Sequence, residues 1–160
     1  MLLKSLAQQQ NLFPISHVRI IDGDTLEATI HLPFEQNLTT RIRLKGWWAD
    51  ELDGPYRGAG LVARFRLESF CDGKALWIQS TSGRKDKYGR IVATLWHSGR
   101  IVAGKEVLGD LQLTEATHKL HRDQARQQAS RAQKWPGDVK GADFEEDRRE
   151  RPPGPEEAYG

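Results

Sequence analysis

The chain has 160 residues, of which 38% are hydrophobic and 29% charged, so it is long enough for one hydrophobic core and too short for two. It contains no apolar segment as long as a membrane span, and residues 1–13 lack the apolar stretch of a secretory signal peptide. We therefore expect a cytoplasmic monomer with no membrane partner. The only cysteine, Cys71, excludes an intramolecular disulfide.

Charge is distributed unevenly along the chain. Residues 1–136 carry 20 basic and 14 acidic side chains, a net charge of +6, whereas residues 137–160 carry 4 basic and 8 acidic ones. A basic body suits a polyanionic partner such as DNA or RNA, although a charge of this size is also ordinary solubility charge. Because the acidic end is also rich in Gly and Pro, we expect a flexible arm over residues 1–15, a folded domain over 16–136 and a disordered tail over 137–160.

Three strand signals begin the expected domain. Residues 18–21 are mostly apolar, and residues 26–32 alternate apolar with polar side chains, which is the pattern of a half-buried strand. In residues 41–46 the apolar Ile42 and Leu44 alternate with Arg43, so that Arg43 projects from the opposite face.

A helix is expected over residues 59–71, with Leu61, Val62, Phe65 and Phe70 near helical spacing. Residues 76–79 and 91–97 supply two further strands. Five short strands with one interposed helix are typical of a small Greek-key barrel, most often an OB-fold. With two more helices, over residues 101–111 and 115–134, the expected fold is α+β: a five-stranded OB-fold β-barrel with about three α-helices.

Two carboxylates, Asp22 and Asp24, flank Gly23 between the first two strands. Side chains two residues apart on an extended segment point the same way, and glycine permits the bend between them. Carboxylate oxygens are the ligands that hard cations prefer. Arg43 and Glu51, the latter in the loop after the third strand, can reach the same place. We expect these side chains to converge.

The segment between the last two strands, residues 82–90, is dense in cations. Arg90 is suited to phosphate binding because a planar guanidinium donates two hydrogen bonds to two oxygens. Lys85 and Lys87 either line a nucleic-acid path or are solvated loop charges. Tyr88 either stacks on a base or covers the edge of the barrel.

Four motifs follow one another in the order Asp22-Gly23-Asp24-Thr25, Arg43-Leu44-Lys45-Gly46, Glu51 and Asp86-Lys87-Tyr88-Gly89-Arg90. Together they resemble the staphylococcal nuclease family, and the likeness extends over about residues 16–136. It implies an OB-type barrel and metal-dependent hydrolysis of phosphodiester bonds in DNA and RNA, usually with Ca²⁺. It also implies that Asp24 binds the metal, that Arg43, Glu51 and Arg90 are catalytic, and that Tyr88 packs on the nucleotide.

The chemistry of phosphodiester hydrolysis requires the same residue types. A cation neutralises charge on the phosphate, and arginines bind its oxygens as they gain charge. Glu51 is suited to act as the general base that orients and deprotonates the attacking water.

Trp48 departs from the family pattern, which has a metal-binding Asp two residues after the glycine that is Gly46 here. An indole cannot ligate calcium, and Asp50 or Asp22 would have to supply the missing carboxylate. A second function therefore stays open: a catalytically weakened or inactive module on the same barrel that binds nucleic acid or a protein partner.

His118 and His121 lie three residues apart in the last expected helix. This spacing suits a pair of metal ligands, but the sequence offers no third ligand. We expect both side chains on a solvated helix surface.

Overall fold

The computed structural model describes residues 11–133. The expected tail over residues 137–160 and most of the expected arm lie outside this range. The chain divides into two compact units, residues 1–126 and residues 127–160. The first contains the barrel and the candidate site, and of the second only residues 127–133 are described.

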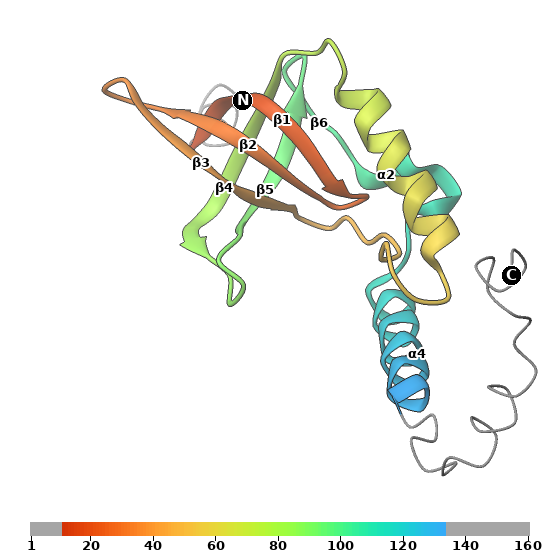
Figure 1. The fold of residues 1–160 in the computed structure, drawn as a ribbon. Helices are drawn as coiled ribbons and strands as arrows, with labels where there is room; N and C mark the ends of the chain where they lie inside the picture. The colour runs from red at the N-terminus through yellow and green to blue at the C-terminus, as the bar shows by residue number, and fades with distance from the viewer. Residues whose placement is uncertain (1–10, 134–160) are drawn as a thin grey trace, which may run out of the picture. The chain divides into compact units, whose positions relative to one another are not determined.

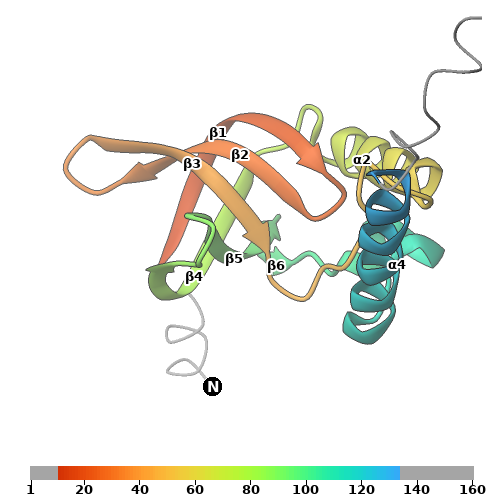
Figure 2. The ribbon, with the colours of Figure 1, turned by 60° about the horizontal axis from the view of Figure 1, so that its bottom comes forward.

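Five strands close into a barrel, and the fold is α+β and OB-fold-like, as the sequence predicts. The sheet order is β3-β2-β1-β4-β5-β6, and a parallel pairing of β3 with β5 completes the closure (Figures 1 and 2). The strands are β1 Leu12–Asp22, β2 Thr25–Leu32, β3 Gln36–Leu44, β4 Leu76–Lys85, β5 Ile91–His97 and the short β6 Arg100–Ile101.

The helices follow the third and the last strands. They are α2 Arg57–Cys71, α3 Gly104–Leu108 and α4 Glu115–Gln133, with a 3-10 turn at Gly109–Leu111. The single helix expected over residues 101–111 is wrong. Its first residue pairs with β5 as part of β6, and Gly109, with φ of 57°, ends α3 because such a backbone conformation favours glycine and terminates helices.

The first strand begins at Leu12, well before the start that the sequence indicated at residue 18. Residues 12–15 pair with residues 76–79 of β4, and Ile15 is buried in the core. The expected boundary between a flexible arm and a domain at residue 16 is therefore wrong for residues 12–15. Pairing with a strand more than 60 residues away stabilises this segment, and local sequence does not reveal such a contact.

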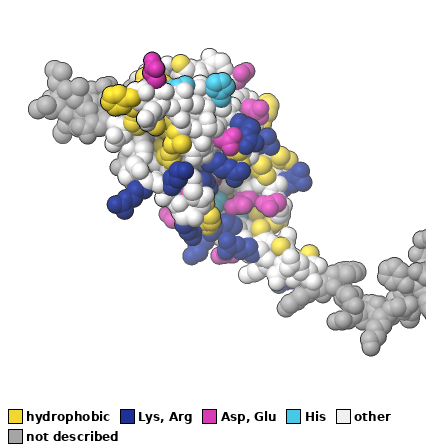
Figure 3. Space-filling view, turned by 60° about the vertical axis from the view of Figure 1, so that its left-hand side comes forward, with side chains coloured by type: hydrophobic (Ala, Val, Ile, Leu, Met, Phe, Trp, Pro, Cys, Tyr) yellow, Lys and Arg dark blue, Asp and Glu magenta, His cyan; other side chains and the backbone are white. Residues whose placement is uncertain are grey.

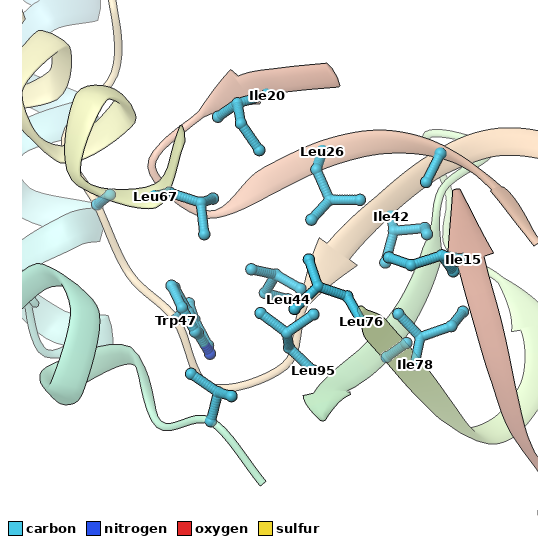
Figure 4. Packing of buried hydrophobic residues seen from close by; sticks show 14 of the residues in the cluster. Ile15, Ile20, Leu26, Ile42, Leu44, Trp47, Leu67, Leu76, Ile78 and Leu95 are labelled. Atoms are coloured by element: carbon cyan, nitrogen blue, oxygen red, sulfur yellow. The ribbon is translucent and has the colours of Figure 1, made fainter. Parts of the chain in front are cut away.

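The core fills the barrel and extends beneath α2. Figure 4 shows Leu26, Leu44, Leu67 and Leu95 directed into one interior, with Trp47 beside them, and these side chains are at most 2% exposed. Trp47 is therefore the core member of the tryptophan pair, and Trp48 is only half-buried.

Two of the three buried residues of helix α2 are small. Its buried residues are Gly60, Ala63 and Leu67, whereas the expected packing residues Leu61, Val62 and Phe65 are 42–67% exposed. A Cβ added at Gly23 would lie 2.7 Å from the Ala63 side chain, so the β1–β2 turn and α2 are in close contact. Close backbone approach requires small side chains, and hydrophobic spacing alone does not reveal it.

No helix of residues 11–133 has both the length and the apolarity that a membrane span requires.

Candidate functional site

Eight of the nine predicted site residues line one cleft of about 550 Å³. They come from the β1–β2 turn, the end of β3, the loop after β3 and the β4–β5 turn: Asp22, Asp24, Arg43, Asp50, Glu51, Lys87, Tyr88 and Arg90. Lys85 is not among the lining residues and is exposed at the end of β4. The structure thus brings side chains from separate motifs together at one end of the barrel.

The carboxylate pair of the β1–β2 turn is held rigidly. The Asp24 backbone N–H donates to Asp22 Oδ1 at 3.0 Å. The Thr25 hydroxyl donates to Asp24 Oδ1 and the Ala49 N–H to Asp24 Oδ2, each at 3.1 Å. Asp24 is 6% exposed. The turn therefore fixes the position of both carboxylates before any ligand binds.

Burial, together with the negative charge of Asp24, raises the pKa of Asp22 from 3.8 to about 7. The positive charge of Arg43 acts in the opposite direction and only partly offsets these effects. Near neutral pH the positive charge around the pair is therefore too small to keep both carboxylates fully ionised. A cation bound there would take the place of the proton on Asp22.

Replacement of Asp22 by Asn should change how stability depends on pH. In the wild-type protein, Asp22 binds its proton more tightly in the folded state than in the unfolded state. The free energy of unfolding of the wild-type protein should therefore fall as the pH rises from 3.8 to about 7. The amide of the Asp22→Asn variant lacks this titration, and the variant should be more stable than wild type at pH 8 by roughly 2 to 4 kcal/mol. Urea unfolding in EDTA at pH 5 and pH 8 measures the difference. Equal pH dependence of both proteins would contradict it.

Arg43 is the cation closest to this pair. Its Nη2 lies 3.5 Å from Asp24 Oδ2, and its Nη1 donates to the Leu44 carbonyl at 2.8 Å. Its guanidinium carbon lies 4.8 Å from the centre of the Trp48 ring. Burial lowers the pKa of Arg43, against the negative charge of Asp24. Trp48 therefore packs on an arginine at the place where the resemblance expects a metal ligand.

Asp86 organises the turn that carries Arg90 and Tyr88. Its Oδ2 accepts a hydrogen bond from Arg90 Nε at 2.9 Å, and its Oδ1 accepts the Tyr88 and Arg90 backbone N–H groups at 2.9 and 2.8 Å. Burial alone would raise the pKa of Asp86, but these bonds lower it. The Tyr88 ring is 60% exposed, which leaves it available to stack on a base. The guanidinium carbon of Arg90 lies 5.0 Å from its centre.

Glu51 lies in the loop after β3, and its side chain is exposed in the cleft. The loop backbone rests directly on α2: a Cβ added at Gly60 would come within 2.3 Å of the Glu51 carbonyl oxygen and 2.8 Å of the Asp50 carbonyl oxygen. Only glycine allows this approach. The backbone of helix α2 thus fixes the position of the loop that carries Glu51.

Gly60→Ala should therefore displace the Glu51 loop and destabilise the protein, because backbone atoms must move to admit the methyl group. We expect a loss of about 1–3 kcal/mol in the free energy of unfolding, measured by urea denaturation. Gly58→Ala is the matched control on the same helix, since nothing lies within 4 Å of its added Cβ. A loss in the Gly58 variant equal to that in the Gly60 variant would refute this explanation.

Helix α4 fixes the other side of the same loop. His121 Nδ1 lies 2.6 Å from Asp50 Oδ1, and the His121 ring stacks on Tyr56 with 3.6 Å between ring centres. The Tyr56 hydroxyl donates to Gln124 Oε1 at 2.6 Å. Asp50 is 7% exposed and has this histidine as a partner. Its predicted role as a substitute metal ligand stays a prediction.

His118 also lies against the cleft. It is 8% exposed, and its ring centre is 5.2 Å from that of Trp48. Burial lowers its pKa, against the negative charge of Glu51, which raises it. The expected position of His118 and His121 on a solvated helix surface is thus wrong. Because α4 is rich in polar residues, its sequence did not indicate that its first turns pack against the barrel domain.

A divalent cation at the carboxylate pair would have to keep much of its water. No group of three or more His, Cys, Asp or Glu side chains in residues 11–133 is arranged to hold a metal ion. Calcium usually takes six to eight oxygens, whereas magnesium is often held by one or two carboxylates, water and substrate phosphate. Asp22 and Asp24 match the second pattern.

Sequence reasoning did not reveal the contacts of four residues at or beside this cleft. Asp86 positions Arg90, Tyr56 and His121 hold the loop, and Arg122 lines the cleft wall. The spacing of His118 and His121 placed them on one helical face, but the sequence did not indicate what that face contacts.

The chain matches no known protein-family model, and no curated protein matches it. The resemblance to the staphylococcal nuclease family therefore rests on the four sequence motifs alone.

Proposed function

We propose that this chain is a metal-dependent nuclease that hydrolyses phosphodiester bonds in DNA, RNA or both. The observation that carries the proposal is the convergence, in one cleft, of a carboxylate pair, two arginines and a glutamate from four separate segments. The resemblance to the staphylococcal nuclease family supports the same conclusion.

In this proposal each side chain has a separate task. Arg43 and Arg90 bind the scissile phosphate and stabilise its negative charge as it grows. Glu51 orients the attacking water and takes its proton. Asp22 and Asp24 would hold the divalent cation, which when bound neutralises charge on the phosphate. Ca²⁺ is the ion that the resemblance implies, and Mg²⁺ is the alternative that the small donor set favours.

Nucleic acid would be held mainly at the cleft. On the face shown in Figure 3, Lys and Arg side chains lie among Asp and Glu side chains rather than in one unbroken basic patch. Lys87 and Tyr88 at the rim of the cleft supply a phosphate contact and a stacking surface. Because the basic area is interrupted, we expect binding of only moderate salt dependence.

One observation favours a second candidate, a binding module without catalysis. Trp48 stands where the family has a metal-binding Asp, and its ring packs against Arg43 and His118. A weakened metal site would leave the arginines and Tyr88 able to hold a nucleic acid.

Cleavage assays distinguish the two candidates. Labelled single-stranded DNA and RNA are incubated with the purified chain and Ca²⁺, Mg²⁺ or Mn²⁺ in turn, or with EDTA. The Glu51→Gln protein, purified in parallel, excludes a contaminating nuclease. Cleavage that needs both metal and Glu51 supports the nuclease. Salt-sensitive binding without cleavage favours a module that binds nucleic acid. Neither binding nor cleavage refutes the nuclease and leaves a module that binds a protein partner.

A further inference from the structure

Arg122 is a cation of the cleft that the proposed mechanism does not use. It lies on α4 one turn after His118, and both residues line the cleft together with Glu51. Side chains four residues apart lie on the same helical face. The wall that α4 contributes therefore carries a guanidinium beside the imidazole that packs on Trp48.

The Arg122 guanidinium differs from those of Arg43 and Arg90. Arg43 has a carboxylate oxygen at 3.5 Å and Arg90 has one at 2.9 Å. The Nε of Arg122 is buried and has no hydrogen-bond partner within residues 11–133, and none of the described carboxylates forms an ion pair with Arg122. An unsatisfied buried charged donor is costly, and such groups usually have an acceptor when the protein performs its task.

A phosphate oxygen is the acceptor that best suits this position. The cleft of about 550 Å³ has the volume of a small-molecule site, and a nucleotide rather than a single phosphate fills such a volume. Positive charge from Arg43 and from Arg122 contributes to the lowered pKa of His118, so both guanidiniums lie near that ring. Arginine binds phosphodiesters well because its donors form a rigid fork.

We propose that Arg122 forms a second phosphate-binding position on the α4 side of the cleft, for the phosphate that neighbours the one bound by Arg43 and Arg90. This inference rests on the proposed function, because it requires a nucleic-acid strand in the cleft. Under this inference the nucleic-acid strand runs from the β4–β5 turn toward the first turns of α4.

Two small probes test the assignment in EDTA, where cleavage does not interfere. Thymidine 5′-monophosphate carries one phosphate, and the dinucleotide pTpT carries two. Arg122→Gln should weaken pTpT binding about 10-fold or more and change monophosphate binding less than about twofold, measured by calorimetry on the full chain. Arg126→Gln, which removes an exposed arginine from the next turn of the same helix, should leave both affinities unchanged.

A second measurement detects the contact directly. The Arg122 Nε–Hε resonance should shift when pTpT is added and move little with the monophosphate. Arg122→Lys should regain part of the pTpT affinity, and unfolding curves of each variant show whether it is folded. Unchanged pTpT binding in Arg122→Gln, or equal weakening for both probes, overturns the inference alone. If wild type binds neither probe, the inference fails, whereas the proposed function is judged separately by the metal-dependent cleavage assay.

Discussion

Replacing Glu51 with Gln should reduce the rate of phosphodiester cleavage by about 10²-fold or more and leave the affinity for oligonucleotides almost unchanged. Glutamine has nearly the same size and can still accept a hydrogen bond from water, but it cannot take a proton at neutral pH. Glu51 is exposed in the cleft, so the substitution leaves no buried group without a partner. Single-turnover cleavage and fluorescence anisotropy with EDTA measure the two quantities.

Glu115→Gln is the matched control for this experiment. Glu115 also lines the cleft and is also exposed, so its replacement makes the same change of charge in the same surroundings without removing the proposed base. We expect its kcat to remain within about twofold of wild type. Equal rates for Glu51→Gln and wild type, or equal losses in the two variants, would show that Glu51 is not the base.

The sequence predicted the fold correctly where the side-chain pattern within one strand or helix is enough to identify that element. The alternation over residues 26–32 lies within β2 (Thr25–Leu32), and β5 (Ile91–His97) spans the range that its apolar residues indicated. Residues 12–15 carried no comparable pattern, because their strand conformation depends on pairing with β4. The inward face of α2 was also misjudged, since its buried residues are Gly60, Ala63 and Leu67.

The site followed from the sequence only in part, for a physical reason. Asp22 and Asp24 are close in sequence, but a turn joins them rather than an extended segment, and the hydrogen bond from the Asp24 N–H to Asp22 Oδ1 holds this local arrangement. The bond between Asp50 and His121 joins residues 71 positions apart, and nothing in either segment specifies the other. The residues predicted for the site belong to recognisable motifs, whereas the residues that hold their loop in place, such as Tyr56 and His121, are determined by packing.

Arg43→Ala should have the largest effect of any single change, because Arg43 serves both structure and chemistry. Its side chain is 12% exposed and lies beside Asp24, so its loss leaves the buried carboxylate pair without its nearest cation. We expect kcat/KM to fall about 10³-fold and oligonucleotide affinity to fall as well. The free energy of unfolding should also decrease, most strongly above pH 7, where the raised pKa of Asp22 no longer keeps that group protonated.

Two companion variants separate these contributions. Arg43→Lys keeps the charge beside Asp24 but loses the planar fork and the packing on Trp48, so it should restore most of the stability and little of the cleavage. Arg41→Ala removes an exposed arginine from the same face of β3 outside the cleft and should change neither. If Arg43→Lys cleaves as fast as wild type, a positive charge at this position is enough for cleavage, and the proposed bidentate binding of the phosphate by Arg43 is wrong. If Arg43→Ala loses stability but not cleavage, Arg43 is a structural counterion, and Arg90 must then bind the scissile phosphate without it.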